Sequence, residues 1–200
     1  MRTAIYGGTF NPIHNAHIHL LEEISKEMNF DRVFVIPTSI PPHKESEYIA
    51  SGEDRINMCN LALKGFSFPF KVLDIELKRN GKSYTVDTLK ELKALYPDDE
   101  FYLIMGEDMF ITLDRWFKFE EIIKLSNICA VIRSEDGLSN MLIKKSEYEN
   151  LGACCEVINV SFIDISSSMI REKIKRNEDI DSLVSKEVFE YIKKHKIYWE

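Results

Sequence analysis

Short apolar runs alternate with helix-period segments along the whole 200-residue chain, and this alternation constrains the fold more than any other feature. Runs of β-branched and aromatic residues predict strands at 3–6, 33–36, 72–77, 101–105 and 128–132, with a weaker one at 157–160. Strands that alternate with helices are typical of repeated βαβ units, whose strands lie parallel. The sequence therefore predicts an α/β fold built on a parallel sheet.

Apolar stripes and capping residues predict the helices between these strands. The segment 16–28 carries an apolar stripe with Glu and Lys on its other side, 51–63 opens with a capping-type serine, and 84–95 stops ahead of a proline. Apolar residues at helical spacing in 185–195 predict a helix that docks on the body of the protein. Because no segment is long enough to act as a linker, we expect residues 1–200 to form a single domain.

The charge balance and the cysteines exclude several classes of protein. The 26 Lys and Arg against 33 Asp and Glu give a net charge of −7, which disfavours nucleic-acid partners. The four cysteines show neither C-x-x-C nor zinc-finger spacing, so we expect reduced thiols. The longest apolar runs are far shorter than the ~20 residues that span a bilayer. The first residues also lack a signal-peptide pattern, so we expect a cytoplasmic protein without a membrane partner.

A glycine-rich segment, GGTFNPIHNAH at residues 7–17, follows the first predicted strand and opens the first helix. Two glycines let the backbone approach a phosphate, and a helix N-terminus presents N–H groups to an anion. His14 and His17 are three residues apart, so both imidazoles can point into one crevice. The alternatives are an ordinary tight turn with exposed histidines, or a metal site that also uses His19. A helix would point His19 away from His17, and no carboxylate lies beside them.

A second segment, ISSSMIR at residues 165–171, also lies where a short apolar run meets a helix. Serines suit an N-cap, and their hydroxyls with the first-turn amides form an anion-binding nest to which Arg171 can add a guanidinium. The alternative is a plain serine cap with a solvated arginine. Both segments open helices in an otherwise acidic chain, which favours one site that holds a polyphosphate from two sides.

These two segments resemble the signatures of the nucleotidylyltransferase superfamily and, more narrowly, of the bacterial nicotinate-nucleotide adenylyltransferases. The resemblance extends along the chain through Ile36-Pro37, Pro41-Pro42-His43-Lys44, Ser83-Tyr84-Thr85, Gly106-Glu107-Asp108 and Trp116. Ser168 replaces the usual Thr but keeps the hydroxyl, and Ala16 replaces a frequent Gly. The resemblance implies a Rossmann-like open parallel sheet with helices on both faces and C-terminal helices docked on the body.

The implied reaction is adenylyl transfer from ATP to nicotinate mononucleotide, which gives deamido-NAD and pyrophosphate. Mg²⁺ would accompany ATP, with no protein metal site. The resemblance implies catalysis by His14, His17, Lys44 and Arg171, ATP binding by Gly7, Gly8, Thr9, Phe10, Asp108, Ser166, Ser167 and Ser168, and mononucleotide binding by Tyr84, Thr85, Trp116 and Phe117. Arg133 would assist at the phosphates or be a solvated surface residue. Trp116 has the alternative of a half-buried core aromatic, and Asp108 that of a helix N-terminal charge.

Three rival functions stay open. An adenylyltransferase acting on nicotinamide mononucleotide differs only by an amide in place of a carboxylate. A phosphopantetheine adenylyltransferase is disfavoured, because such enzymes are usually shorter and lack the Ser-Tyr-Thr and Trp pattern. A non-catalytic nucleotide-binding domain is disfavoured by intact His14, His17 and Arg171. The oligomeric state is open, a homo-oligomer included.

Overall fold

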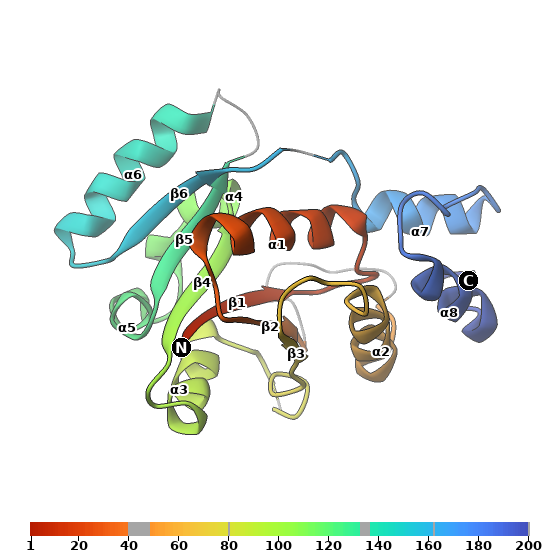
Figure 1. The fold of residues 1–200 in the computed structure, drawn as a ribbon, viewed down its shortest axis with the longest axis horizontal. Coiled ribbons are helices and arrows are strands. Elements are labelled where there is room, and N and C mark those ends of the chain that lie inside the picture. Colours follow the sequence, from red (N-terminus) through yellow and green to blue (C-terminus); the bar gives the residue numbers. More distant parts are fainter. Residues whose placement is uncertain (40–48, 80, 133–136, 162, 200) are drawn as a thin grey trace.

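Six parallel strands form one sheet at the centre of the protein (Figure 1). The computed structural model describes residues 1–39, 49–79, 81–132, 137–161 and 163–199. The strands lie in the order β3-β2-β1-β4-β5-β6, and each neighbouring pair is parallel. Their bounds are β1 Arg2–Gly8, β2 Arg32–Pro37, β3 Phe70–Val72, β4 Glu100–Gly106, β5 Asn127–Ile132 and β6 Cys155–Asn159.

Eight α-helices and one short 3₁₀ helix occur in the described part of the chain. They are α1 Asn15–Met28, α2 Gly52–Ala62, α3 Thr85–Leu95, α4 Glu107–Ile111, η1 Leu113–Arg115, α5 Phe119–Leu125, α6 Leu138–Asn150, α7 Ser167–Lys175 and α8 Lys186–His195. The helices predicted at 16–28, 51–63, 84–95 and 185–195 are confirmed to within one or two residues. The sequence analysis did not single out α4, α5 or α6.

The strand predicted at 72–77 is wrong over most of its length, because β3 ends at Val72. After Leu73 donates its N–H to the Val35 carbonyl, the chain leaves the sheet in a turn in which the Lys78 N–H bonds to the Asp74 carbonyl. The turn also buries the Glu76 side chain, which accepts a hydrogen bond from Thr88 of α3 at 2.7 Å. Ile75 is buried in the same core as residues of α3, and Glu76 bonds to α3 directly.

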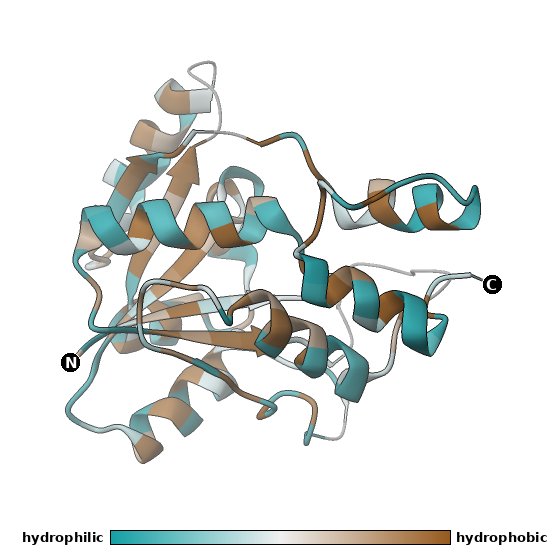
Figure 2. Ribbon diagram, turned by 45° about the vertical axis from the view of Figure 1, so that its right-hand side comes forward, coloured by the Kyte–Doolittle hydropathy of each residue, from teal (hydrophilic) through white to brown (hydrophobic). Residues whose placement is uncertain are grey.

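The sheet has a hydrophobic core on each face, since successive residues of a strand point to opposite sides. On β2, Val33 and Val35 pack into a cluster with α1, α2, α7 and α8, whereas Phe34 and Ile36 pack into a cluster with α3, α4, α5 and α6. The central strands therefore carry continuous buried apolar runs, such as 33–36 and 101–105, as parallel strands covered on both faces do. Figure 2 shows the same pattern, with hydrophobic strands under helices that are hydrophilic on their outer side. The predicted fold class is confirmed, and so is the docking of the C-terminal helix.

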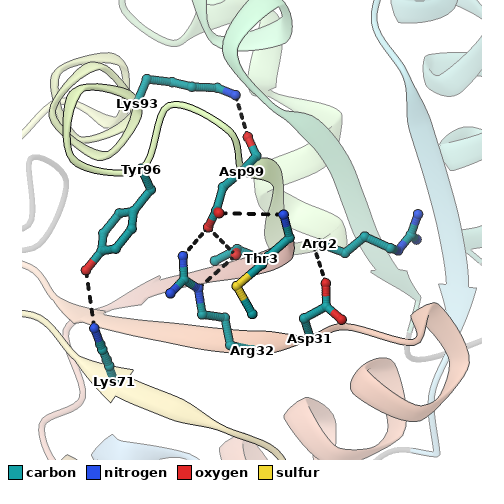
Figure 3. A network of polar contacts seen from close by, with 9 residues as sticks. Arg2, Thr3, Asp31, Arg32, Lys71, Lys93, Tyr96 and Asp99 are labelled. Carbon is teal, nitrogen blue, oxygen red and sulfur yellow. Dashed lines mark hydrogen bonds and ion pairs between the residues drawn. The ribbon is translucent and has the colours of Figure 1, made fainter.

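The amino end of the sheet is closed by a network of charged side chains (Figure 3). Asp99, which precedes β4 and is buried, accepts hydrogen bonds from Thr3 of β1 and from Arg32 of β2. The N-terminal ammonium lies 3.6 Å from the same carboxylate. The Arg32 guanidinium also lies over the rings of Phe34 and Tyr96, at 4.7 and 4.5 Å. This network joins the starts of three strands.

The carboxyl end of the sheet contains the point where the strand order reverses, between β1 and β4. The chain leaves β1 toward α1 on one face and leaves β4 toward α4 on the other. Ligands of open α/β sheets bind in the crevice at such a point. In Figure 1 the N-termini of α1 and α7 meet beyond this end of the sheet. Separately, no helix among the described residues is both long and apolar enough to cross a membrane.

Candidate functional site

The segment between β1 and α1 is a tight loop with specific residue requirements. A Cβ on Gly8 would lie 2.9 Å from the Phe10 ring, so this ring can pack over the backbone only if residue 8 is glycine. Phe10 itself is buried and adopts a left-handed φ of 47°, which is costly for a residue with a side chain and is maintained by its packing. The loop therefore has a fixed shape at the position predicted to bind phosphate.

His14 and His17 meet at the start of α1. Their rings stack with centroids 3.7 Å apart, and the His14 backbone N–H donates to Nδ1 of His17 at 3.2 Å. Because Nδ1 accepts this bond, a neutral His17 carries its proton on Nε2, which is then the ring's donor. His14 is buried and His17 half-buried. The structure thus brings the two predicted histidines together.

His19 lies apart from this pair, as expected from helical geometry. Its Nε2 lies 3.0 Å from the Ser161 carbonyl and 2.7 Å from the Ser161 hydroxyl. Across the residues that the structure describes, no group of three His, Cys, Asp or Glu side chains is placed to hold a metal ion. All four cysteines are free thiols. His19 is thus separate from the His14–His17 pair.

The serine segment contacts the glycine loop directly, although about 155 residues separate them in the sequence. The Ser167 hydroxyl donates to the Pro12 carbonyl at 2.8 Å. Nη1 of Arg171 donates to the Asn11 carbonyl at 2.9 Å, and Nη2 donates to the Ser168 hydroxyl at 3.3 Å. Two helix N-termini, those of α1 and α7, are thereby held side by side.

The three serines of this segment make different contacts. Ser166 is the N-cap of α7 and accepts the Met169 N–H at 3.2 Å, so the serine cap weighed in the sequence analysis is present. The Ser167 hydroxyl binds the loop, and Ser168 is exposed beside Arg171. The alternative of a merely solvated Arg171 is wrong, because its guanidinium is bonded to the loop.

The backbone carbonyls of the loop are turned to protein donors. Four of them accept hydrogen bonds from elsewhere in the chain: Gly8 from the Thr38 N–H, Thr9 from Arg55, Asn11 from Arg171 and Pro12 from Ser167. A carbonyl oxygen carries partial negative charge and would repel a phosphate. Since these oxygens are already paired with donors, the loop is suited to an anionic ligand.

The cations of the site are not neutralised by carboxylates in the described part of the structure. Arg55 and Arg171 donate to backbone carbonyls and a hydroxyl, and no ion pair joins either to a described Asp or Glu. Burial lowers the pKa of Arg55 from its ordinary value, against the opposing influence of Cys59 and Tyr198. Arginine stays protonated in proteins. Both guanidinium groups therefore keep their charge without a described carboxylate partner.

The residues predicted to hold the mononucleotide lie around the start of α3. Tyr84 is the N-cap of this helix, Thr85 is its first residue, and the Tyr84 ring lies 4.7 Å from that of the exposed Phe117. Trp116 is half-buried and packs against the core between the sheet and α3, α4, α5 and α6. The structure brings Tyr84 and Phe117 together, with Trp116 adjacent in the chain.

The structure gives less information about three other predicted residues, Asp108, Lys44 and Arg133. Asp108 is exposed in the first turn of α4, at the end of β4, and its carbonyl accepts the Thr112 hydroxyl at 2.9 Å. Lys44 and Arg133 lie outside the described residues. Arg55 was missed by the sequence analysis, although it lies on the same helical stripe as Met58 and Cys59. A charged residue on a buried stripe is the signal that would have found it.

Comparison with known proteins supplies the family. A family model described as cytidylyltransferase-like matches residues 5–173. The chain belongs to the cytidylyltransferase-like family. A relative from Dehalococcoides mccartyi, named probable nicotinate-nucleotide adenylyltransferase, is 38% identical over 99% of this chain and 97% of its own length. A relative of the same name from Lactococcus lactis is 35% identical over 98% and 95%. These similarities confirm the resemblance inferred from the motifs.

Solved structures share the fold of this cytidylyltransferase-like chain. Plasmodium falciparum nicotinic acid mononucleotide adenylyltransferase complexed with NaAD matches with a TM-score of 0.76 and 23% identity, over 98% of this chain and 97% of that one. The same protein complexed with APC matches with a TM-score of 0.73 and 22% identity, over 98% and 96%. At this identity the likeness shows the fold, and the full coverage extends it from the first strand to the C-terminal helices.

Proposed function

We propose that this protein is a nicotinate-nucleotide adenylyltransferase, with residues 1–200 as one nucleotidylyltransferase domain. The observation that carries the proposal is the direct bonding of the serine segment to the glycine loop through Ser167 and Arg171. It joins two helix N-termini, a histidine pair and an arginine at the reversal point of the sheet. Relatives over 35% identical along the whole chain carry this name.

The reaction needs positioning and charge stabilisation. An oxygen of the mononucleotide's 5′-phosphate attacks the α-phosphorus of ATP, and the bond from that phosphorus to the bridging oxygen breaks. Pyrophosphate leaves with the electron pair, and no covalent enzyme intermediate forms. Negative charge grows on the oxygens around the reacting phosphorus, so preorganised donors lower the barrier. A site rich in N–H donors supports this chemistry.

The residues take the following roles in the proposal. His14 and His17 donate to the α- and β-phosphates, His17 through Nε2. Arg171 and Lys44 hold the phosphates, and the start of α7 with Ser166, Ser167 and Ser168 adds amide and hydroxyl donors. The loop of Gly7, Gly8, Thr9 and Phe10 lines the triphosphate, and Asp108 accepts from a ribose hydroxyl.

The nicotinate carboxylate would bind at the N-terminus of α3. The first amides of a helix lack intrahelical partners, and the helix dipole favours an anion there. Tyr84 caps this helix without a side-chain hydrogen bond to it, which supports a backbone-amide site at Tyr84 and Thr85. Trp116 and Phe117 offer aromatic faces to the pyridine ring.

A divalent metal would enter with ATP. In this proposal the Mg²⁺ ion takes most of its oxygen ligands from phosphates and water. Mg²⁺ would neutralise phosphate charge. The chain's own contribution is to orient the phosphates through His14, His17 and Arg171.

The deciding experiment compares kcat/KM for nicotinate and nicotinamide mononucleotide, with saturating Mg-ATP and pyrophosphate release as the readout. We expect a preference of at least ~10²-fold for the acid, because an amide cannot use a site built for a carboxylate. Similar rates would keep adenylyl transfer and reject the carboxylate pocket. Inactivity with both, followed by activity with phosphopantetheine, would assign the neighbouring enzyme. Inactivity with all three would favour a non-catalytic nucleotide-binding domain.

A further inference from the structure

Two residues distant in sequence hold the glycine loop from outside the proposed catalytic set. Arg55 of α2 donates from Nη1 to the Thr9 carbonyl at 2.9 Å and to the Thr38 carbonyl at 2.7 Å, and from Nε to the Ala50 carbonyl at 3.1 Å. Tyr198, at the C-terminal end of the chain, donates its hydroxyl to Oδ1 of Asn11 at 2.8 Å. Both contacts reach the segment between β1 and α1.

Arg55 joins three segments at one point. It is only 2% exposed, and it donates hydrogen bonds to backbone carbonyls of the loop, of Thr38 just after β2 and of Ala50 two residues before α2. Burying a guanidinium is costly unless its N–H groups are satisfied. The planar fork meets these carbonyls in fixed directions, which a lysine ammonium cannot reproduce. The relative position of the three segments therefore depends on this side chain.

Tyr198 is equally constrained. It is 1% exposed and adopts a φ of 74°, a left-handed conformation that is strained for a residue with a Cβ. Such a conformation is maintained where the surroundings determine the side chain's position. Oδ1 of Asn11, which accepts the Tyr198 hydroxyl, also accepts the Ala50 N–H at 3.0 Å.

Asn11 connects these contacts to the proposed chemistry. Its side chain is held by Tyr198 and its backbone carbonyl by Arg171, so a displacement of Asn11 displaces the partner of the phosphate-binding arginine. Thr9, held by Arg55, is two residues away. We propose that Arg55 and Tyr198 are positioning residues that align the glycine loop and Arg171 for adenylyl transfer. This inference rests on the proposed function.

The first test compares two Tyr→Phe variants near the C-terminus. Tyr198→Phe removes the hydroxyl bonded to the loop and keeps the ring. Tyr191→Phe is the matched control, because its hydroxyl donates to Asp54 at 2.9 Å and accepts from Asn57 at 3.0 Å on α2. The rates are measured with both substrates saturating, at a temperature well below the Tm of the less stable variant. We expect kcat to fall about tenfold in Tyr198→Phe and less than about twofold in Tyr191→Phe. The reason is that small misplacements of reacting groups strongly reduce the rate. The KM values should change little.

The second test compares two Arg→Lys variants. Arg55→Lys keeps the positive charge and loses the planar guanidinium group. Arg32→Lys makes the same change in the network at the amino end of the sheet. We expect kcat to fall about 10²-fold in Arg55→Lys and to stay within about twofold in Arg32→Lys, even where Arg32→Lys lowers Tm as much. If Arg55→Lys does not fold, the tyrosine pair decides, since phenylalanine keeps the packing.

The outcomes separate this inference from the proposed function. Wild-type protein that releases no pyrophosphate rejects the function, and the inference with it. The wild type is active in the second outcome, but the paired variants lose kcat equally, or their losses simply follow the drop in Tm. This result shows that Arg55 and Tyr198 are structural only. Active wild type with selective loss in Tyr198→Phe supports the positioning role.

Discussion

The two ends of the sheet use charged residues in opposite ways. At the amino end, Arg32 and Asp99 pair with each other, and the pair is completed by Thr3 and the N-terminal ammonium. At the carboxyl end, Arg55 and Arg171 donate to backbone carbonyls and a serine, with no ion pair to a described carboxylate. The amino-end charges are paired for stability, whereas the carboxyl-end guanidinium groups are bonded to uncharged acceptors. Variants at the two ends should therefore separate stability from catalysis.

The largest effect on catalysis is expected from His17→Ala. Loss of one preorganised donor to the reacting phosphates should lower kcat by ~10²–10³-fold, with little change in the free energy of unfolding because the ring is half-buried. Steady-state pyrophosphate release and a thermal melt measure the two quantities. His19→Ala is the control, since its ring contacts Ser161 away from the pair. Normal turnover in His17→Ala would remove His17 from the mechanism.

The largest effect on stability is expected from Asp99→Ala. Removing the carboxylate leaves the partly buried Arg32 without its partner, a type of change that costs about 3 kcal/mol of unfolding free energy. Urea unfolding measures this loss. At a temperature where the variant is folded, kcat should equal that of the wild type, because Asp99 lies at the opposite end of the sheet. A kcat loss comparable to that of His17→Ala would contradict the division between the two ends.

Trp116→Ala should have a smaller and more selective effect. We expect KM for the mononucleotide to rise about tenfold while KM for ATP stays within about twofold, because the ring is proposed to contact only the nicotinate. Initial rates with each substrate varied in turn measure this. If both KM values rise together, Trp116 is a core aromatic and not a nicotinate-binding residue. Its packing against the core that contains α3, α4, α5 and α6 represents this alternative.

The smallest effect is expected in the pH dependence of the amino-end network. Burial alone would raise the pKa of Asp99, but hydrogen bonds from Thr3 and Arg32 and the charges of Arg32 and the N-terminus outweigh it, so the pKa lies below its ordinary value. The stability contributed by this carboxylate is therefore complete above the unfolded pKa of about 3.9 and is lost as pH falls through the folded pKa. The Tm difference between wild type and Asp99→Asn should be constant from about pH 5 to 7 and shrink below about pH 4. A difference that grows on acidification would contradict the assigned pairing.

Much of the fold could be predicted because burial on both faces leaves a strong local pattern. The runs 33–36, 101–105 and 128–132 lie inside strands, the capping serine at 51 marks a true helix start, and the apolar spacing in 185–195 matches α8. The run 72–77 misled because Ile75 and Glu76 are buried against α3 in a turn, and burial alone resembles a strand in a short segment. The prediction that Tyr84 and Phe117 bind the mononucleotide came from the family resemblance and not from any local pattern.

The sequence by itself determined the parallel α/β architecture, the glycine loop with its two histidines, and the serine segment with Arg171. Each depends on neighbours within one or two turns, so local spacing is sufficient. Tertiary structure alone decided that Arg171 meets Asn11, that Arg55 binds three carbonyls, and that Tyr198 reaches the loop from the other end of the chain. These contacts join residues between 5 and 187 positions apart, and the backbone carbonyls that accept from Arg171 and Arg55 leave no signature in the sequence. Every residue has a backbone carbonyl, so only the folded structure decides which carbonyl accepts a given hydrogen bond.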